Sequence, residues 1–344
     1  MLKSAIVSAA LTLACLCAPF AARADCKMVQ VAELPLDPHS YSPIADGQID
    51  GQPVKVLIDT GSSTSMLSHA AANKLGLAFR PLAGVSLYGI GGQRQAYGTT
   101  VKSFQVGQLV GANMNMIGTD SLGAGLAAIL GNDILSQFDI EFDLPDHAIR
   151  LFKPEGCSAE QLVYWNKPYS LAPLLATSRD APSIRTTAML NGQRINAEID
   201  SGAGVTVVDK GVAGRVGAVL DTAVSAPDEH GLGQQARPAD VGLFKSFALG
   251  EEQVGNVKIE LISLIGDLQL ADQSTDSRIA HSVSGDTEAM MLIGDDFLRV
   301  HRVLVANREH AIVFSYMGGP VFFIPKAEPK AEPKAEPAPG KPTP

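Results

Sequence analysis

The chain has 344 residues, of which 46% are hydrophobic and 18% charged, and its formal net charge is −9. This length is sufficient for two compact units, each with its own hydrophobic core. Because the net charge is acidic and no basic block interrupts it, the composition argues against binding to nucleic acid or to an anionic membrane surface.

Residues 1–24 have the pattern of an export signal. A positive charge at Lys3 precedes an apolar stretch over 5–20, and Ala22-Arg23-Ala24 has the small-x-small form of a cleavage site. An uncleaved anchor is the alternative, although the apolar stretch is short for a membrane span. Cleavage leaves 25 basic against 36 acidic residues, a net charge of −11. We expect an exported protein, periplasmic or secreted, with no membrane insertion after signal cleavage.

Two cysteines, Cys26 and Cys157, remain after this cleavage. A pair of cysteines in an exported protein favours one disulfide, and two free thiols are the alternative. The bond would tie an N-terminal lead-in (25–43) to a proline-bearing connector (153–183). A short pro-segment is the alternative interpretation of the lead-in.

A framework centred on Asp59 organises residues 44–152. A hairpin is predicted at Asp50-Gly51, where both turn positions need positive φ, and the strand that follows runs into Asp59. The stretch 69–75 has helical composition and ends at Gly76. A glycine cluster follows at 89–92, and an apolar pair closed by glycine lies at 129–131. Short alternating strands, frequent turns and few helices indicate a mostly β unit.

The same framework is repeated around Asp200 over residues 184–318. Its hairpin is Asn191-Gly192, its helical stretch covers 210–216, its glycine cluster lies at 231–233 and its apolar pair at 292–294. In both copies a glycine lies 8 residues before the Asp, and others lie 2 and 17 residues after it. A repeat with matched spacing predicts two homologous lobes. The second copy is longer by 20 residues around 266–288, where we expect a surface loop.

The C-terminal segment 326–344 repeats Lys-Ala-Glu-Pro three times. Proline at every fourth position prevents a stable helix, and the segment has nothing apolar to bury. We expect a disordered, solubilising tail, with a spacer or an attachment to the envelope as the alternative.

Two Asp-centred motifs suggest two carboxyl groups brought face to face. Such a pair shares one proton, so one carboxylate can take a proton from water while the other carboxyl donates to a peptide carbonyl. The residues expected to support the pair are Thr60, Gly61 and Ser62 in the first motif and Ser201, Gly202 and Ala203 in the second. The hydroxyls would hydrogen-bond across the lobe interface, and the glycines would allow close approach of backbone N–H groups.

The glycine clusters lie where a mobile hairpin could close over a bound peptide. The residues of these expected flaps are Gly89, Gly91 and Gly92 in the first copy and Gly231 and Gly233 in the second. Glycines supply hinges for such a closure. An ordinary turn is the alternative for each cluster.

Other hydrolytic chemistry has little support in the sequence. Neither a His-Glu-x-x-His zinc signature nor a Gly-x-Ser-x-Gly nucleophile elbow is present. We expect His147 and His310 at turns, and Asp133, Asp295 and Asp296 as loop caps rather than metal ligands. No metal and no cofactor is predicted.

Together these residues resemble the aspartic protease families, both the retropepsins and the bilobal pepsin-like enzymes. The resemblance rests on the Asp-Thr/Ser-Gly-Ser/Ala motifs, the glycine-bearing flaps and the later apolar-apolar-Gly steps, and it covers roughly 44–152 and 184–314. Lobes of this size are similar to retropepsin subunits fused in one chain, as in bacterial retropepsin-like proteases. The resemblance implies the acid protease fold, with two closed β-barrel-like lobes, pseudo-twofold symmetry, short helices and a cleft between the lobes. It places Asp59 and Asp200 at the catalytic positions.

The expected function is therefore that of an exported aspartic endopeptidase, a monomer with an internal pseudo-dimer, acting on extended polypeptide segments. Ala203 departs from the hydroxyl at Ser62, a substitution familiar among retropepsins. A non-catalytic peptide-binding protein of the cell envelope that retains the cleft is the alternative. A third interpretation is an envelope assembly factor that acts through its tail.

Overall fold

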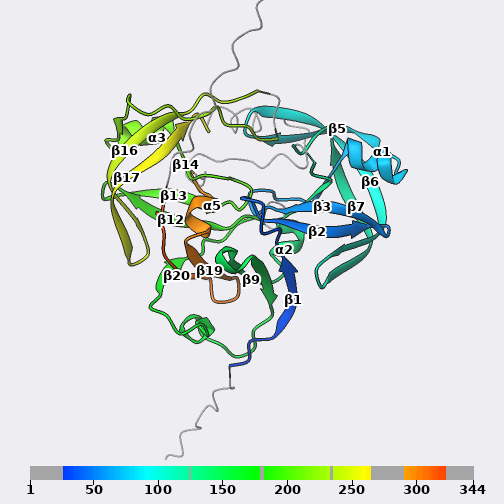
Figure 1. Cartoon of the computed structure of the whole chain (residues 1–344), viewed down its shortest axis with the longest axis horizontal. Helices are drawn as coiled ribbons and strands as arrows, with labels where there is room; N and C mark the ends of the chain where they lie inside the picture. The colour runs from blue at the N-terminus through cyan, green and yellow to red at the C-terminus, as the bar shows by residue number, and fades with distance from the viewer. Residues whose placement is uncertain (1–25, 124, 179–181, 233–234, 265–289, 323–344) are drawn as a thin grey trace, which may run out of the picture.

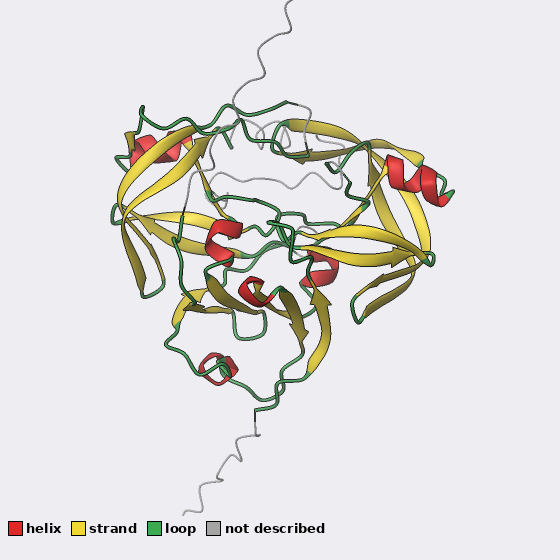
Figure 2. Ribbon diagram, viewed as in Figure 1, coloured by secondary structure: helices red, strands yellow, loops and turns green. Residues whose placement is uncertain are grey.

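The computed structural model describes residues 26–123, 125–178, 182–232, 235–264 and 290–322. The expected export signal, the expected loop at 266–288 and the expected tail at 326–344 lie outside the described residues. The described chain is built mainly of strands with a few short helices (Figure 2). Among these residues, no helix combines the length and the apolarity that a membrane crossing requires.

The first lobe is a barrel that closes on itself. Its strands follow the order β2-β3-β8-β4-β7-β6-β5, and β2 also pairs with β6, so six strands form a closed ring and β5 extends it at β6 (Figure 1). The strands are β2 (Ile44–Ile49), β3 (Gln52–Ile58), β4 (Met66–Ser68), β5 (Arg80–Gly89), β6 (Gly92–Val106), β7 (Leu109–Thr119) and β8 (Ala128–Leu130).

The second lobe has the same topology. Its order is β12-β13-β18-β14-β17-β16-β15, closed by a pairing of β12 with β16. The strands are β12 (Arg185–Leu190), β13 (Gln193–Ile199), β14 (Val207–Asp209), β15 (Val219–Leu220), β16 (Asp240–Leu249), β17 (Glu252–Ile262) and β18 (Met291–Ile293). The two closed barrels confirm the predicted fold, a mostly β acid protease fold of two homologous lobes.

A third, antiparallel sheet joins the lobes and was not predicted from the sequence. Its order is β1-β10-β9-β19-β20-β11, so each lobe contributes to it and β9 pairs with β19 at its centre. The strands are β1 (Gln30–Pro35), β9 (Asp139–Asp143), β10 (Ala148–Phe152), β11 (Ser170–Pro173), β19 (His301–Ala306) and β20 (Ala311–Tyr316). The lead-in thus supplies β1 and the connector supplies β11.

The short helices cap the barrels and the ends of the sheets. They are α1 (His69–Leu75), α2 (Asn132–Leu135), α3 (Lys210–Arg215), α5 (Asp295–Leu298) and the 3-10 turns η1 (Leu144–Asp146) and η2 (Ala159–Leu162). The Ser68 side chain accepts from the N–H of Ala71 at the start of α1, and Gly76 ends this helix with φ 68°. The matched helix α3 starts at Asp209, whose side chain accepts from two backbone N–H groups of its first turn.

Left-handed turn residues mark equivalent places in the two copies. The hairpin residues Asp50 and Asn191 have φ 49° and 51°, and each is followed by a glycine of positive φ, as type I′ turns require. His147 and His310 also have positive φ, 53° and 50°, at the turns before β10 and β20. Both histidines therefore have a turn conformation, as the sequence suggested.

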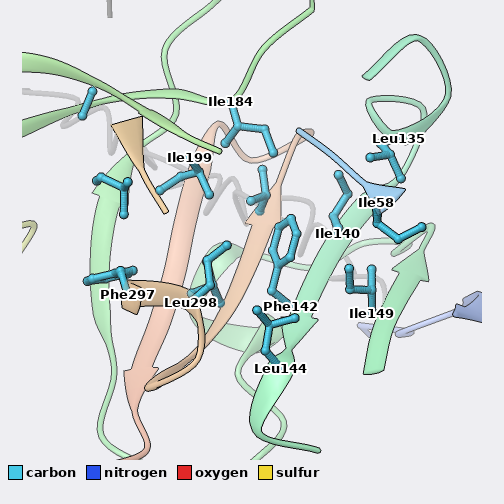
Figure 3. Close-up of a cluster of buried hydrophobic side chains, with 14 of the residues drawn as sticks. Ile58, Leu135, Ile140, Phe142, Leu144, Ile149, Ile184, Ile199, Phe297 and Leu298 are labelled. Carbon is cyan, nitrogen blue, oxygen red and sulfur yellow. The ribbon is translucent and has the colours of Figure 1, made fainter. Parts of the chain in front are cut away.

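One hydrophobic core runs through both lobes and the sheet between them. Ile58 and Ile199, each the last residue before an Asp motif, are fully buried in it. Figure 3 shows these two side chains in one cluster with Phe142 of β9 and Phe297 and Leu298 of α5. The strands that carry the two motifs thus end on a common, close-packed base, which limits how far either motif can move relative to the other.

The N-terminal segment and the connector are linked covalently. A disulfide joins Cys26 to Cys157, across 131 residues of sequence. Next to it along the chain, β1 pairs with β10 over Gln30–Pro35. The lead-in is therefore an integral part of the sheet between the lobes.

A buried ionic network lies on the sheet between the lobes. Glu141 and Asp143 of β9 are fully buried, and the Arg150 guanidinium donates to both at 2.7 Å. Arg302 of β19 donates to the same Glu141 at 2.9 Å and lies over the rings of Tyr164 and Trp165. Charge pairing of this kind offsets the cost of removing the two carboxylates from water.

Candidate active site

Asp59 and Asp200 each follow a strand of the barrel wall, β3 in lobe 1 and β13 in lobe 2. The backbone N–H of Asp59 donates to the carbonyl of Leu130, and that of Asp200 donates to the carbonyl of Ile293. These carbonyls belong to the apolar pairs predicted to pack beneath the loops, on β8 and β18. The two motifs are therefore supported in the same way in both lobes.

The hydroxyls of Thr60 and Ser201 hold the two loops together across the lobe interface. Thr60 Oγ1 donates to the Ile199 carbonyl at 2.7 Å and accepts from the Ser201 N–H at 3.1 Å. Ser201 Oγ donates to the Ile58 carbonyl at 2.8 Å and accepts from the Thr60 N–H at 3.1 Å. Both side chains are fully buried. Four crossed hydrogen bonds in a dry interface fix the spacing of the residues that precede and follow them.

Backbone N–H groups orient each carboxyl group. Gly61 and Ser62 donate to Asp59 Oδ1 at 2.9 and 3.2 Å, and Gly202 donates to Asp200 Oδ1 at 2.8 Å. The Ala203 N–H donates to the Asp200 backbone carbonyl at 3.2 Å and also lies close enough to the Asp200 carboxyl to lower its pKa. Backbone N–H groups at the same two motif positions therefore act on each carboxyl.

The glycines of the motifs face the opposite carboxyl. A Cβ atom added at Gly61 would overlap the Asp200 carboxylate, and one added at Gly202 would overlap the Asp59 carboxylate. Only glycine leaves room for this mutual packing. Each carboxyl thus lies against the loop of the other lobe.

Burial raises the pKa of both carboxyl groups. Burial, then the nearby charge of Asp200, raises the pKa of Asp59 to about 8, against the donation from Gly61 and Ser62. The pKa of Asp200 is also raised, chiefly by burial. Two carboxyls this close cannot both ionise at low cost, so the pair holds a shared proton.

A third carboxyl, that of Asp295, lies next to the pair. In lobe 1 the matched position is Asn132, whose side-chain amide donates to the Thr60 carbonyl at 2.5 Å. Asp295 is fully buried, and burial together with the Asp200 charge holds its pKa well above the usual range. A neutral, protonated Asp295 is therefore the state that this environment favours.

The two expected flaps meet each other but differ in structure. The first is a regular hairpin of β5 and β6 with Gly91 and Gly92 at positive φ (Figure 1). Arg94 Nε of this hairpin donates to the Leu232 carbonyl at 2.8 Å, and the Gln235 N–H donates to the Gly91 carbonyl at 3.1 Å. The close approach of the two segments explains why Gly89 and Gly231 are glycines, because a Cβ atom at either position would overlap a residue of the opposite segment.

The flap of the second lobe is not a paired hairpin. Its described part holds one isolated bridge, between Glu229 and Arg237, and Gly233 lies outside the described residues. Prolines at 227 and 238 remove N–H donors from both arms, which accounts for the missing ladder. Within the described residues, the segment around Gly231 therefore does not form the paired hairpin that the first lobe has.

The other acidic candidates have structural partners. Asp133 accepts from the N–H and the hydroxyl of Ser65, and Asp296 accepts in the same way from Thr206. Both tie the segment after an Asp motif to the helix that follows the apolar pair. Within the described ranges, no group of His, Cys, Asp and Glu side chains is arranged to hold a metal ion.

Two functional candidates on the dyad side of lobe 2, Glu198 and Glu260, were missed by sequence reasoning. Glu198 precedes Asp200 by two residues, where lobe 1 has Leu57 before Asp59. A position-by-position comparison of the two copies would have exposed this acidic replacement of an apolar residue.

Comparison with known proteins agrees with this geometry. Residues 45–137 match the family model described as gag-polyprotein putative aspartyl protease. The match spans the Asp59 loop, the regular flap and the glycine-closed apolar pair of lobe 1. No curated protein matches the chain. With this match in the first lobe and the same closed barrel in the second, the chain is similar to the retropepsin-like aspartyl proteases and has their fold in both lobes.

Proposed function

We propose that the chain is an exported aspartic endopeptidase in which Asp59 and Asp200 together activate a water molecule. The observation that carries the proposal is the crossed hydrogen bonding of Thr60 and Ser201, which holds two partly desolvated carboxyls against each other's loops. The family match in lobe 1 supports proteolysis as the reaction class.

The reaction proceeds without a covalent enzyme intermediate. The ionised carboxylate takes a proton from water, whose oxygen attacks the peptide carbonyl carbon, while the protonated carboxyl donates its proton to the carbonyl oxygen. The resulting diol collapses when a carboxyl protonates the departing amine and the other carboxylate takes a hydroxyl proton back. The dyad ends with the single proton it began with, so neither Asp has a fixed role.

The flap and the loops fit an extended polypeptide substrate. A peptide lying between the regular flap and the Asp pair can hydrogen-bond to strand edges through its backbone. Entry of the peptide requires the hydrogen bonds at Leu232 and Gly91 to break, because they join the two flap segments to each other. Both Asp residues come from one polypeptide, so a monomer contains a complete dyad.

Export is supported by the sequence pattern of residues 1–24 and by the disulfide. Disulfides persist in oxidising compartments such as the periplasm or the extracellular space. We propose one of these as the site of action.

The test is cleavage of a peptide library by the chain starting at Asp25. Asp59→Asn and Asp200→Asn should each abolish cleavage, because either change removes the ionisable pair while keeping the shape of the side chain. Asp46→Asn is the matched control, since this carboxylate is 82% exposed and pairs with Lys55. Undiminished cleavage by both dyad variants would overturn the proposal. Peptide binding without turnover by the unaltered protein would instead favour a binding protein that retains the fold.

A further inference from the structure

The surfaces that the two lobes turn toward the dyad and flaps differ in chemistry. In lobe 1 this surface is an apolar cluster that contains buried residues of β3, β4 and β8 together with flap residues. Its members include Leu57, Met66, Ile129, Leu87 and Ala96, with Ile44 and Ile117 packed against them. We call it the lobe 1 dyad-side cluster.

The strand registers identify the equivalent positions in lobe 2. Leu57 faces Ile44 across β2 and β3, and the matched pair across β12 and β13 is Glu198 with Arg185. Two apolar side chains of lobe 1 are thus replaced by an acid and a base. Arg185 Nε lies 3.7 Å from Glu198 Oε2, so the Glu198 charge has a cation beside it within lobe 2.

At the second replacement, no ion pair with a basic side chain forms among the described residues. Met66 pairs with Ile117 between β4 and β7, and the matched pair between β14 and β17 is Val207 with Glu260. Val207 belongs to the lobe 2 dyad-side cluster, which also contains Ile262 and receives Ile90 from the tip of the regular flap. Since Glu260 precedes Ile262 by two residues on β17, the two side chains share that face.

Glu260 is fully buried, and no described backbone N–H or basic side chain donates to its carboxylate oxygens. The group beside it is another carboxyl, that of Glu229 in the irregular flap of lobe 2. Burial and the charge of Glu229 raise the pKa of Glu260 to about 8. A buried carboxyl whose neighbour is a second acid is costly unless a proton or a cation lies between them.

We propose that the lobe 2 side of the substrate-binding cleft receives a basic side chain of the polypeptide, with Glu260 and Glu229 as its acceptors, whereas the lobe 1 side receives an apolar one. The proposal rests on the endopeptidase function proposed above. A lysine ammonium carries three donors and an arginine guanidinium carries five, so either can satisfy both carboxylates at once. The cation takes the place of the proton that the two acids share when the site is empty. Because Glu229 belongs to the flap segment bonded to Arg94, the same contact would close that segment over the bound side chain.

The test compares pairs of peptides that differ at one position, lysine against norleucine, with the position moved in turn along both sides of the cleaved bond. Norleucine keeps most of the length and the apolar stem of lysine and removes the charge. At one position the unaltered enzyme should cleave the lysine peptide with a kcat/KM about tenfold or more above that of its partner, a difference of about 1.4 kcal/mol. Glu260→Gln should bring this ratio close to one. Asp240→Asn is the matched control, because its carboxylate on neighbouring β16 is half exposed and pairs with Lys210.

The outcomes separate this proposal from the one on which it rests. Equal cleavage of lysine and norleucine peptides at every position, or an unchanged preference in Glu260→Gln, overturns the basic-residue proposal and leaves endopeptidase activity standing. If no peptide is cleaved, the endopeptidase proposal fails. Calorimetric measurement of the binding of the same peptide pairs then tests whether Glu260 and Glu229 accept a basic side chain. Tighter binding of the lysine peptide, lost in Glu260→Gln, then supports the acceptor site, and equal affinities overturn it.

Discussion

Replacing Thr60 by Val removes one hydroxyl from the lobe interface and keeps the shape of the side chain. That hydroxyl donates to the Ile199 carbonyl and accepts from the Ser201 N–H, at 2.7 and 3.1 Å. Thr60 and Ser201 are both fully buried, so water cannot take the place of the lost group. The variant therefore leaves one buried donor and one buried acceptor without their partner.

The expected loss of stability follows from these two groups. Each buried polar group left without its partner costs about 1–3 kcal/mol, so Thr60→Val should lower the free energy of unfolding by about 2–6 kcal/mol. This is a large part of the stability of about 5–15 kcal/mol typical of a folded domain. Urea unfolding of the chain starting at Asp25, with its disulfide intact, measures the change from the midpoint and slope.

Thr186→Val provides the matched control. Thr186 is also fully buried on a barrel strand, but its hydroxyl has no hydrogen-bond partner among the described residues. Removing it should be neutral or slightly stabilising, since no partner is left behind. If the two variants changed the free energy of unfolding by the same amount, the stabilising role given to the crossed hydrogen bonds would be refuted.

Three further predictions concern charge and covalent linkage. Burial raises the pKa of Asp59 to about 8, so the folded state keeps a proton that the unfolded chain releases from about pH 4 upward. The melting temperature should therefore be higher at pH 5 than at pH 8. A melting temperature that rises from pH 5 to pH 8 would contradict the raised pKa of Asp59. Arg150→Met should lower the free energy of unfolding in urea by about 3 kcal/mol, the lower end of the range for a broken buried ion pair, because Arg302 still pairs with the buried Glu141. An unchanged urea midpoint would show that the ionic network contributes nothing to stability. Reducing the disulfide of Cys157 should lower the free energy of unfolding by about 3–5 kcal/mol, measured with and without reductant, and no difference would argue against a closed loop in the native chain.

Asp295→Asn is the fourth of these shorter predictions. Asparagine is the residue at the equivalent position of lobe 1, Asn132, where its amide donates to a loop carbonyl. Replacing a buried acid of strongly raised pKa by an amide should increase stability more at pH 8 than at pH 5, because the folded state must hold a proton that the unfolded chain releases from about pH 4 upward. Thermal unfolding at both pH values checks this, and a loss of stability at high pH would contradict a neutral Asp295.

Local sequence signals predicted the hairpins and the motif loops. They did not predict the pairing of strands that are far apart in the sequence. Asp50-Gly51 and Asn191-Gly192 predict turns because these residue types adopt the positive φ that such turns require. The sheet between the lobes depends on β9 pairing with β19, which lies more than a hundred residues away in the chain. Its outer strands β1 and β11 are six and four residues long and each ends in a proline, so no periodicity marks them. Register between such segments is set by packing, which a single sequence does not display.

The flap of lobe 2 shows the limit of matched spacing. Glycines at equal distances from each Asp predicted equivalent flaps, and both segments do reach the dyad side. The backbone between the glycines decides the conformation, and in lobe 2 Pro227 and Pro238 remove ladder donors. Spacing therefore predicted the place of the segment but not its structure.

Fusing the two lobes in one chain separates the chemistry of the two halves of the site. In a symmetric dimer of identical lobes, a substitution such as Leu57 to glutamate would appear on both sides of the substrate at once. Here the core-facing residues are apolar in both copies, and both copies keep the hydroxyl residue, Thr60 or Ser201, that forms the crossed hydrogen bonds. Acidic replacements fall on the dyad-facing side of lobe 2, at Glu198 and Glu260, next to an Asp200 whose pKa is already raised. Charge placed there acts on one side of a bound peptide only, so a single chain can distinguish the two ends of its substrate.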